Sequence, residues 1–184
     1  MSLETSHPIV KNETFNEVLF HERNVAFGGE YTNEELKVVE QIILATSEHL
    51  TDECKAQNKT GFMVSVALND KSIISVQIGE IDQEDPKYAP DGKKVKYLDF
   101  SRAKVSFLQY NTNCSRSSQD NPSLDNLGGK TTLHGENVVG GAVAFDNGYI
   151  IGISGLSSNP IDDEDASLKI GKILGFKEAT SDII

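Results

Sequence analysis

The sequence predicts an α+β domain in which helices pack on an antiparallel β-sheet. Apolar residues alternate in two pairs of neighbouring segments, and a short turn joins the members of each pair, which is typical of β-hairpins. Segments with helical spacing of apolar residues precede, separate and follow these pairs. Because the strands come in hairpins and do not alternate singly with helices, an antiparallel sheet is favoured over a parallel, doubly wound one.

The chain length suits one domain. A chain of 184 residues can bury a core that needs no metal or disulfide. We expect residues 31–184 to form this single domain and residues 1–30 to be an N-terminal arm packed on it. Four of the six residues from Phe15 to Phe20 are apolar and favour burial, although their pattern fits a short helix as well as part of a strand.

Charge and composition argue against some classes of partner, although they leave room for a local basic patch. The net charge of −11 is unfavourable for a surface that binds nucleic acid or anionic lipid. No apolar segment approaches the roughly 20 residues that span a bilayer, and the polar N-terminus does not resemble a secretory signal. The cysteines Cys54 and Cys114 form no CxxC pair, which indicates a reduced intracellular protein. We therefore expect a cytoplasmic protein that binds neither nucleic acid nor membranes.

The first helix is predicted from about residue 33 to residue 56. Thr32 and Glu35 form a capping-box pattern, in which each side chain accepts a hydrogen bond from the other's backbone N–H. An apolar stripe at helical spacing follows and should face the core. Its members are Leu36, Val39, Ile43, Leu50 and Cys54.

A hairpin and a second helix come next. Residues 62–68 and 74–78 alternate as strands around the turn Asn69-Asp70-Lys71. Residues 80–97 are predicted to form a long loop. The second helix is expected over residues 98–111, with Leu98, Ala103, Val105 and Leu108 facing inward.

The last third of the chain predicts a second hairpin and a final helix. A polar loop at 112–136 precedes strands at 141–146 and 149–154, and Asn147-Gly148 suits a type I′ turn between them. The final helix is expected to start near Asp162, after Pro160, and to end at a Gly175 cap. Its predicted buried stripe consists of Ala166, Ile170, Ile173 and Leu174.

The order of these segments and their glycines resembles the GlcG/HbpS family of haem-binding and haem-degrading domains, which also form the C-terminal part of PduO-type corrinoid adenosyltransferases. The similarity spans about residues 33–175. Besides the first helix and the strand from residue 64, it rests on Arg102-Ala103-Lys104, Gly140-Gly141-Ala142-Val143, Ile151-Gly152, Ser154-Gly155 and Asp165-Ala166. Family members commonly carry proline shortly after the glycine pair, which this chain lacks, so the resemblance is to a divergent member.

The resemblance implies a layered fold of the profilin or PAS kind, homo-oligomerisation, and a site near Gly140 and Gly141 for a small molecule such as haem or a related tetrapyrrole. Glycine lets the backbone approach a ligand closely, but the same pair also suits the shaping of a sheet edge. Lys104 either faces a cleft and binds a carboxylate there, or is solvated. These three residues, with His134, are the candidate ligand-binding residues.

Histidines are the candidate iron ligands, and they are His7, His21, His49 and His134. His134 lies beside Glu136 in the loop before the glycine pair and is the best placed for haem or a metal, although it also fits a loop histidine without a partner. His49 falls off the apolar stripe of the first helix and is expected at the surface. No two histidines have metal-ligand spacing such as HxxxH.

The acidic run from Asp162 to Asp165 opens the final helix. Carboxylates there cap the free N–H groups and interact favourably with the positive end of the helix dipole. The alternative is a weak cation site.

We expect a small-molecule-binding domain with no strong catalytic activity. No Ser/His/Asp or Cys/His arrangement is evident, and the glycines around Ser154 do not fit a GxSxG elbow. A protein-interaction or assembly module that uses the loops 80–97 and 112–136 is the alternative. An enzyme would most naturally show weak oxidative breakdown of haem.

Overall fold

The computed structural model describes residues 18–23, 30–81, 97–118, 132–133, 136–137, 140–157 and 160–180. Most of the predicted loops at 80–97 and 112–136 therefore lie outside the described residues.

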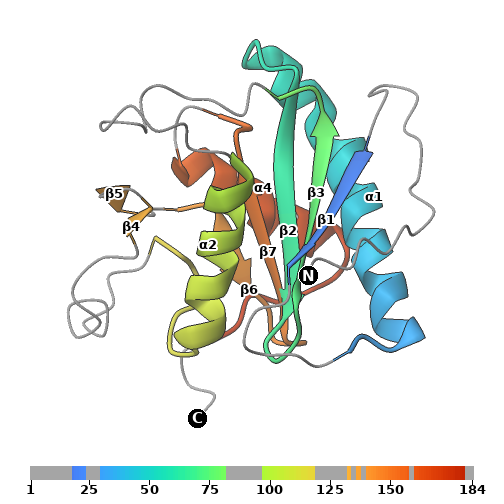
Figure 1. Cartoon of the computed structure of the whole chain (residues 1–184), viewed down its shortest axis with the longest axis vertical. Helices are drawn as coiled ribbons and strands as arrows, with labels where there is room; N and C mark the ends of the chain where they lie inside the picture. The colour runs from blue at the N-terminus through green and yellow to red at the C-terminus, as the bar shows by residue number, and fades with distance from the viewer. Residues whose placement is uncertain are drawn as a thin grey trace.

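Five strands form one antiparallel sheet in the order β1-β3-β2-β7-β6 (Figure 1). They are β1 (Val18–Arg23), β2 (Gly61–Leu68), β3 (Ile73–Gly79), β6 (Ala142–Ala144) and β7 (Tyr149–Ser154). The α+β prediction is confirmed.

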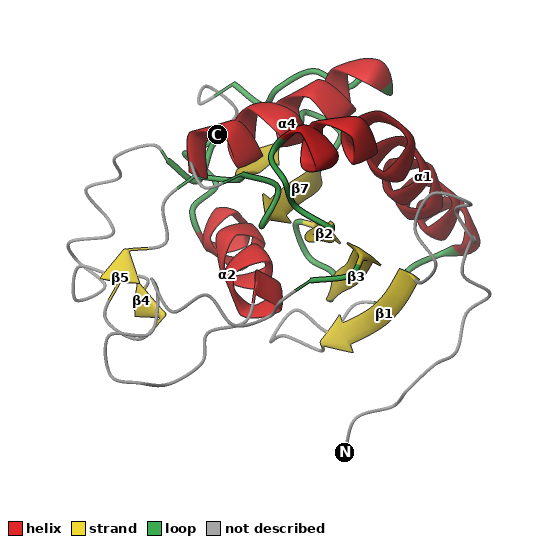
Figure 2. Cartoon of the chain, turned by 90° about the horizontal axis from the view of Figure 1, so that it is seen from above, coloured by secondary structure: helices red, strands yellow, loops and turns green. Residues whose placement is uncertain are grey.

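The helices cover both faces of the sheet. They are α1 (Asn33–Ala56), α2 (Tyr97–Tyr110) and α4 (Pro160–Ile173), and a small hairpin pairs β4 (Thr132–Leu133) with β5 (Glu136–Asn137). Figure 2 shows α1 and α4 on one face and α2 on the other. In the part of the chain that the structure describes, no helix has both the length and the apolar character needed to cross a membrane.

Two apolar cores follow from the alternation in β2. Phe62, Val64 and Val66 belong to the larger core, which includes the inner faces of α1 and α4. Ala67 belongs to the smaller core under α2, which includes Val105 and Leu108. Both faces of β2 are buried, because each is covered by a helical layer.

The predicted start of α1 is confirmed, but its buried stripe differs in part. Thr32 and Glu35 exchange both capping-box hydrogen bonds. Ile42 is fully buried, and Ile43 is only half-buried. Three hydroxyl residues that the apolar pattern does not register are also buried, namely Thr46, Ser47 and Thr51. Thr46 and Thr51 enter the core because their hydroxyls donate to carbonyls one turn earlier in the helix.

The turn between β6 and β7 is not of type I′, so this prediction is wrong. Type I′ needs positive φ at two central residues, whereas Gly148 has φ 84° and Asn147 is not in the left-handed region. The loop has three residues, because Phe145 and Tyr149 close it through the bond from Phe145 N to Tyr149 O, and Gly148 N donates to Phe145 O. This is a type I turn followed by a left-handed glycine.

The final helix ends as predicted, but its buried face is rotated. Gly175 has φ 78°, and Phe176 N donates to Gly171 O, which is a Schellman cap. Ile173 is 45% exposed, contrary to the prediction. The buried face centres instead on Ser167 and Gly171, small residues against which other elements pack closely, as the Phe145 ring does at Gly171.

The edge strand β6 is covered by two further segments. Ser117 N donates to Ala142 O, and Ala144 N donates to Ser115 O, so residues 115–117 lie along β6. The C-terminal segment, residues 177–179, pairs with the end of β6 and the residues after it, through the hydrogen bonds from Ala179 N to Ala144 O and from Asp146 N to Lys177 O. A two-point ion pair between Arg116 and Glu178 joins these two covering segments at 2.7 and 2.9 Å.

Candidate functional site

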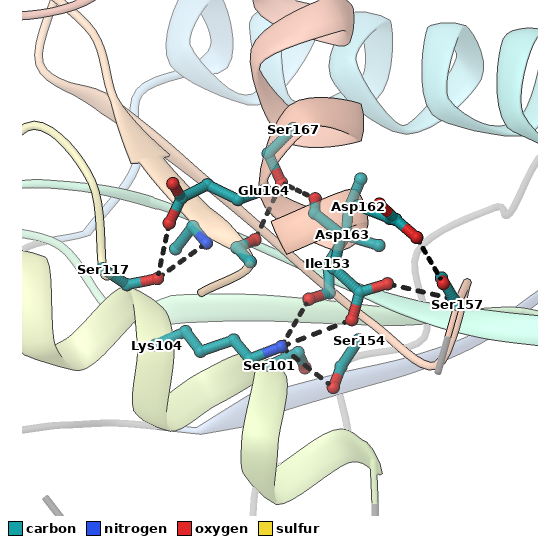
Figure 3. Close-up of polar contacts among 12 residues, drawn as sticks. Ser101, Lys104, Ser117, Ile153, Ser154, Ser157, Asp162, Asp163, Glu164 and Ser167 are labelled. Carbon is teal, nitrogen blue, oxygen red and sulfur yellow. Dashed lines mark hydrogen bonds and ion pairs between the residues drawn. The ribbon is translucent and has the colours of Figure 1, made fainter. Parts of the chain in front are cut away.

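A buried lysine joins the two helical layers. Lys104 lies on α2, yet its ammonium reaches Asp163 on α4, which covers the opposite face of the sheet (Figure 3). Nζ donates to Ile153 O at 3.0 Å, to Ser154 Oγ at 3.3 Å and to Asp163 Oδ2 at 3.5 Å. The two charged side chains are only 4% and 5% exposed. We call Lys104, Ser154 and Asp163 the cross-layer cluster.

Gly141 makes room for this lysine. Its φ is 114°, and a Cβ built on it would overlap Lys104 Nζ and lie 2.7 Å from Ile153 O. Its carbonyl accepts hydrogen bonds from Ile153 N and from the Ser167 hydroxyl. Gly140 is buried and also left-handed, with φ 56°. The close approach that the glycine pair suggested is therefore made at Gly141 by the chain's own Lys104.

Burial disfavours both charges of the ion pair. Desolvation lowers the pKa of Lys104 below its ordinary value, and Asp163 opposes this shift. Desolvation likewise raises the pKa of Asp163, and Lys104 opposes that shift. Asp163 Oδ1 also accepts a hydrogen bond from Ser157 N at 3.2 Å, and the backbone N–H of Gly155 bonds to the same carboxylate. Each ion is therefore tolerated because the other is present.

The neighbouring Glu164 points to a different partner. Its carboxylate accepts bonds from Ser118 N at 3.0 Å, from Ser118 Oγ at 2.7 Å and more distantly from Ser117 Oγ at 3.5 Å. Ser117 Oγ in turn accepts from Ala142 N. Glu164 thereby fixes residues 117–118 to the first turns of α4, as Figure 3 shows for Ser117.

The four carboxylates of the acidic run therefore have different surroundings. Asp162 accepts from the Ser157 hydroxyl, Asp163 turns to Lys104, Glu164 turns to residues 117–118, and Asp165 is exposed. Asp162 and Asp163 both bond to Ser157, in the segment just before the helix. Among the described residues, no three acidic, histidine or cysteine side chains converge to hold a metal.

A chain of three buried serine hydroxyls lies between α2 and the sheet. Ser75 and Ser101 each lie 2.7 Å from Ser65, oxygen to oxygen. Arg102 Nε can only donate to Ser75, and Leu98 O can only accept from Ser101. The protons are thereby directed from Ser75 to Ser65 to Ser101, with every hydroxyl donating once. The chain binds α2 to β2 and β3.

The structure brings together three of the four candidate ligand-binding residues. Lys104 contacts the Gly141 backbone directly, and Gly140 is the next residue. His134 falls between β4 and β5 and lies outside the described residues. His49 is exposed on α1, as predicted. His21 lies in β1 opposite Ser75 in the strand register.

Sequence reasoning missed Asp163 and Ser154 as partners of Lys104. Helical spacing offered a signal, because Asp163, Ser167 and Ile170 recur on one face of α4 and all three are buried. The expectation of a solvated lysine is wrong, because Lys104 is buried and its carboxylate partner is the chain's own Asp163. Binding of a ligand's carboxylate stays a prediction.

The cluster suits structural binding better than catalysis. A lysine 3.3 Å from a serine hydroxyl is the pairing that activates a nucleophile in some hydrolases. Here the ammonium already donates to three acceptors, and Ser154 is buried. Neither group is presented to a substrate. Comparison of the chain with protein-family models, curated proteins and solved structures finds no match.

Proposed function

We propose that this chain is a small-ligand-binding domain of the GlcG/HbpS type, with haem or a related tetrapyrrole as its ligand and without strong catalytic activity. One observation carries the proposal. The sequence segments behind the resemblance meet at a single point: Lys104 from α2, Gly141 before β6, Ser154 at the end of β7, and the start of α4. They act as one structural unit, which supports a shared architecture rather than scattered matches.

The proposed ligand contacts lie around this unit and not within it. Lys104 and Gly141 are occupied by each other and by Asp163, so they support the site without touching the ligand. The β4–β5 hairpin, which carries His134 between its strands, lies against α2. Imidazole is a common axial ligand of haem iron, and His134 is our candidate for this role.

Haem titration tests the proposal. A Soret shift that saturates at micromolar haem is expected for the wild-type protein and should be lost or strongly weakened in His134→Ala. His49→Ala, which removes an exposed histidine on α1, is the matched control and should bind as the wild type does. The absence of a Soret shift would refute haem binding, and a shift unchanged in His134→Ala would refute the assigned ligand.

The enzymatic alternative has its own test. Oxidative haem breakdown predicts loss of haem absorbance under reductant and oxygen, with a bilin-like product that persists when peroxide is removed by catalase. We expect bound haem to keep its absorbance under these conditions.

An assembly module is the second candidate, and the clamp on residues 115–118 favours it. Glu164 and Glu178 fix this segment from two sides, directly before residue 119. A firmly held base suits a loop that contacts a partner or a second copy. Replacement of residues 119–131 by a short Gly/Ser linker should then abolish homo-oligomerisation in sedimentation experiments and leave haem binding unchanged. Unchanged oligomers would argue against this role.

A further inference from the structure

The donors that surround Asp163 come from parts of the chain other than the helix that carries it. Lys104 belongs to α2, and the two backbone N–H groups belong to residues 155 and 157, in the connection between β7 and α4. Asp163 itself lies within the first turns of α4. Removal of the Asp163 side chain would therefore leave all three donors in place.

The donors are arranged for a planar group with two oxygens. Ser157 N is 3.2 Å from Oδ1, whereas Lys104 Nζ is 3.5 Å from Oδ2. The ammonium also needs a negative partner, because it is buried and its other two acceptors, Ile153 O and Ser154 Oγ, are neutral. A carboxylate satisfies both requirements. A chloride ion offers one acceptor atom in place of two oxygens, and a neutral amide lacks the charge.

We propose that Lys104 and the backbone amides of the 155–157 connection form a carboxylate-binding site, and that Asp163 occupies this site as a tethered internal ligand. A free carboxylate, or the carboxylate of a larger ligand, competes with Asp163 for these donors. When it takes the site, Asp163 is displaced, and the first turn of α4 loses its tie to α2. This site does not depend on haem binding.

Variants of Asp163 separate the site from its occupant. Asp163→Ala should bind formate and acetate saturably, with a midpoint in the millimolar range, a rising Tm, and shifts of the Gly155 and Ser157 amide resonances. The wild-type protein should need at least tenfold more carboxylate for the same response, because its tethered ligand competes at high effective concentration. Asp162→Ala is the matched control, since Asp162 is exposed, lies beside Asp163 in the acidic run and accepts a hydrogen bond from the Ser157 hydroxyl. It should behave as the wild type does.

Two further probes test the chemistry of the site. Chloride at equal ionic strength and formamide at equal concentration should not reproduce the response of Asp163→Ala. Lys104→Met combined with Asp163→Ala should lose it. A folded Asp163→Ala protein without saturable formate binding, or with an equal response to chloride, would overturn the proposal.

If Asp163→Ala does not fold in plain buffer, the proposal is tested by refolding it from urea in formate or in sodium chloride. Recovery of folded protein should rise and saturate with formate only. Equal recovery in both salts, or recovery in neither, would also overturn it.

Discussion

Lys104 and Asp163 depend on each other because neither ion has access to water. Lys104→Met should lower the free energy of unfolding by about 3–5 kcal/mol at pH 7, the usual cost of leaving one buried charge without its partner. Urea denaturation followed by circular dichroism measures this loss. Lys104→Met combined with Asp163→Asn should recover much of it, since no buried charge remains. A loss below about 1 kcal/mol in the single variant, typical of surface pairs, would contradict the assignment.

The pH dependence of that single variant has a definite sign. Burial already raises the pKa of Asp163, and the loss of Lys104 removes the main opposing charge. A group with a raised pKa in the folded state binds more protons when folded, so its contribution to stability grows as the pH falls toward the ordinary pKa of aspartate. The deficit of Lys104→Met relative to the wild type should therefore shrink from pH 7 toward about pH 4. A deficit that grows would contradict this.

Two left-handed glycines make a matched test of the space at Gly141. Gly141→Ala introduces both backbone strain and a clash with Lys104 and Ile153 O. Gly148→Ala introduces strain alone, since the nearest atom to its Cβ would be Leu68 Cδ2, at an ordinary 3.6 Å. We expect about 1–2 kcal/mol of destabilisation for Gly148→Ala and a clearly larger loss for Gly141→Ala. Equal losses would show that the contacts with Lys104 and Ile153 O are both relieved without cost.

At the scale of elements, the serine chain determines how α2 docks on the sheet. Ser65→Ala removes the central hydroxyl and leaves Ser75 and Ser101 each without one partner, so a loss of about 1–3 kcal/mol is expected. Ser106→Ala is the control. Ser106 lies on α2, as Ser101 does, but it is only half-buried, so this variant should stay within about 0.5 kcal/mol of the wild type. Thermal unfolding of both variants measures the difference. A neutral Ser65→Ala would mean that apolar contacts alone hold α2.

The sequence predicted the elements better than it predicted their contacts. The capping box, the alternation in β2 and β3, and Gly175 are local signals, and each identified its element correctly. The burial of Ser65 and Lys104 has no local signal, because each of these polar side chains is satisfied in the core by partners distant in the sequence. The buried face of α4 was predicted wrongly for another reason. Ser167 and Gly171 are buried because their small size lets other elements pack closely, and an apolar pattern does not register such residues.

The C-terminal segment is another element whose attachment can be tested. The hydrogen bond from Arg116 lowers the pKa of Glu178 below its ordinary value. A lowered pKa contributes stability above the ordinary value, and this contribution is lost as the pH falls through the folded-state value. Glu178→Gln should therefore speed hydrogen exchange at Ala179 N, which donates to Ala144 O, and should do so more at pH 7 than in acid. Unchanged exchange would place the attachment elsewhere.

At the scale of the whole molecule, the two cysteines report on global opening. Cys54 and Cys114 are both buried, and burial raises the pKa of Cys54 to about 11. The thiolate is the reactive form, so both thiols should resist an aromatic disulfide reagent at pH 8 and react quickly in urea. Lys104→Met should speed the native reaction in proportion to its lost stability. Fast labelling of Cys54 in the wild-type protein would contradict the tight packing around α1, and fast labelling of Cys114 would contradict the packing of the smaller core under α2.

The ion pair that Lys104 makes past Gly141 also determines whether the chain can be split into two fragments that fold separately. A cut between residues 118 and 132 would leave α2 and Lys104 on one fragment, and β6, β7, α4 and Asp163 on the other. Strand β7 lies beside β2, inside the sheet, so the second fragment supplies an interior strand as well as the counter-ion. Each fragment alone would carry an unmatched buried charge and an open sheet edge. The two pieces should therefore reconstitute the domain only as a complementing pair.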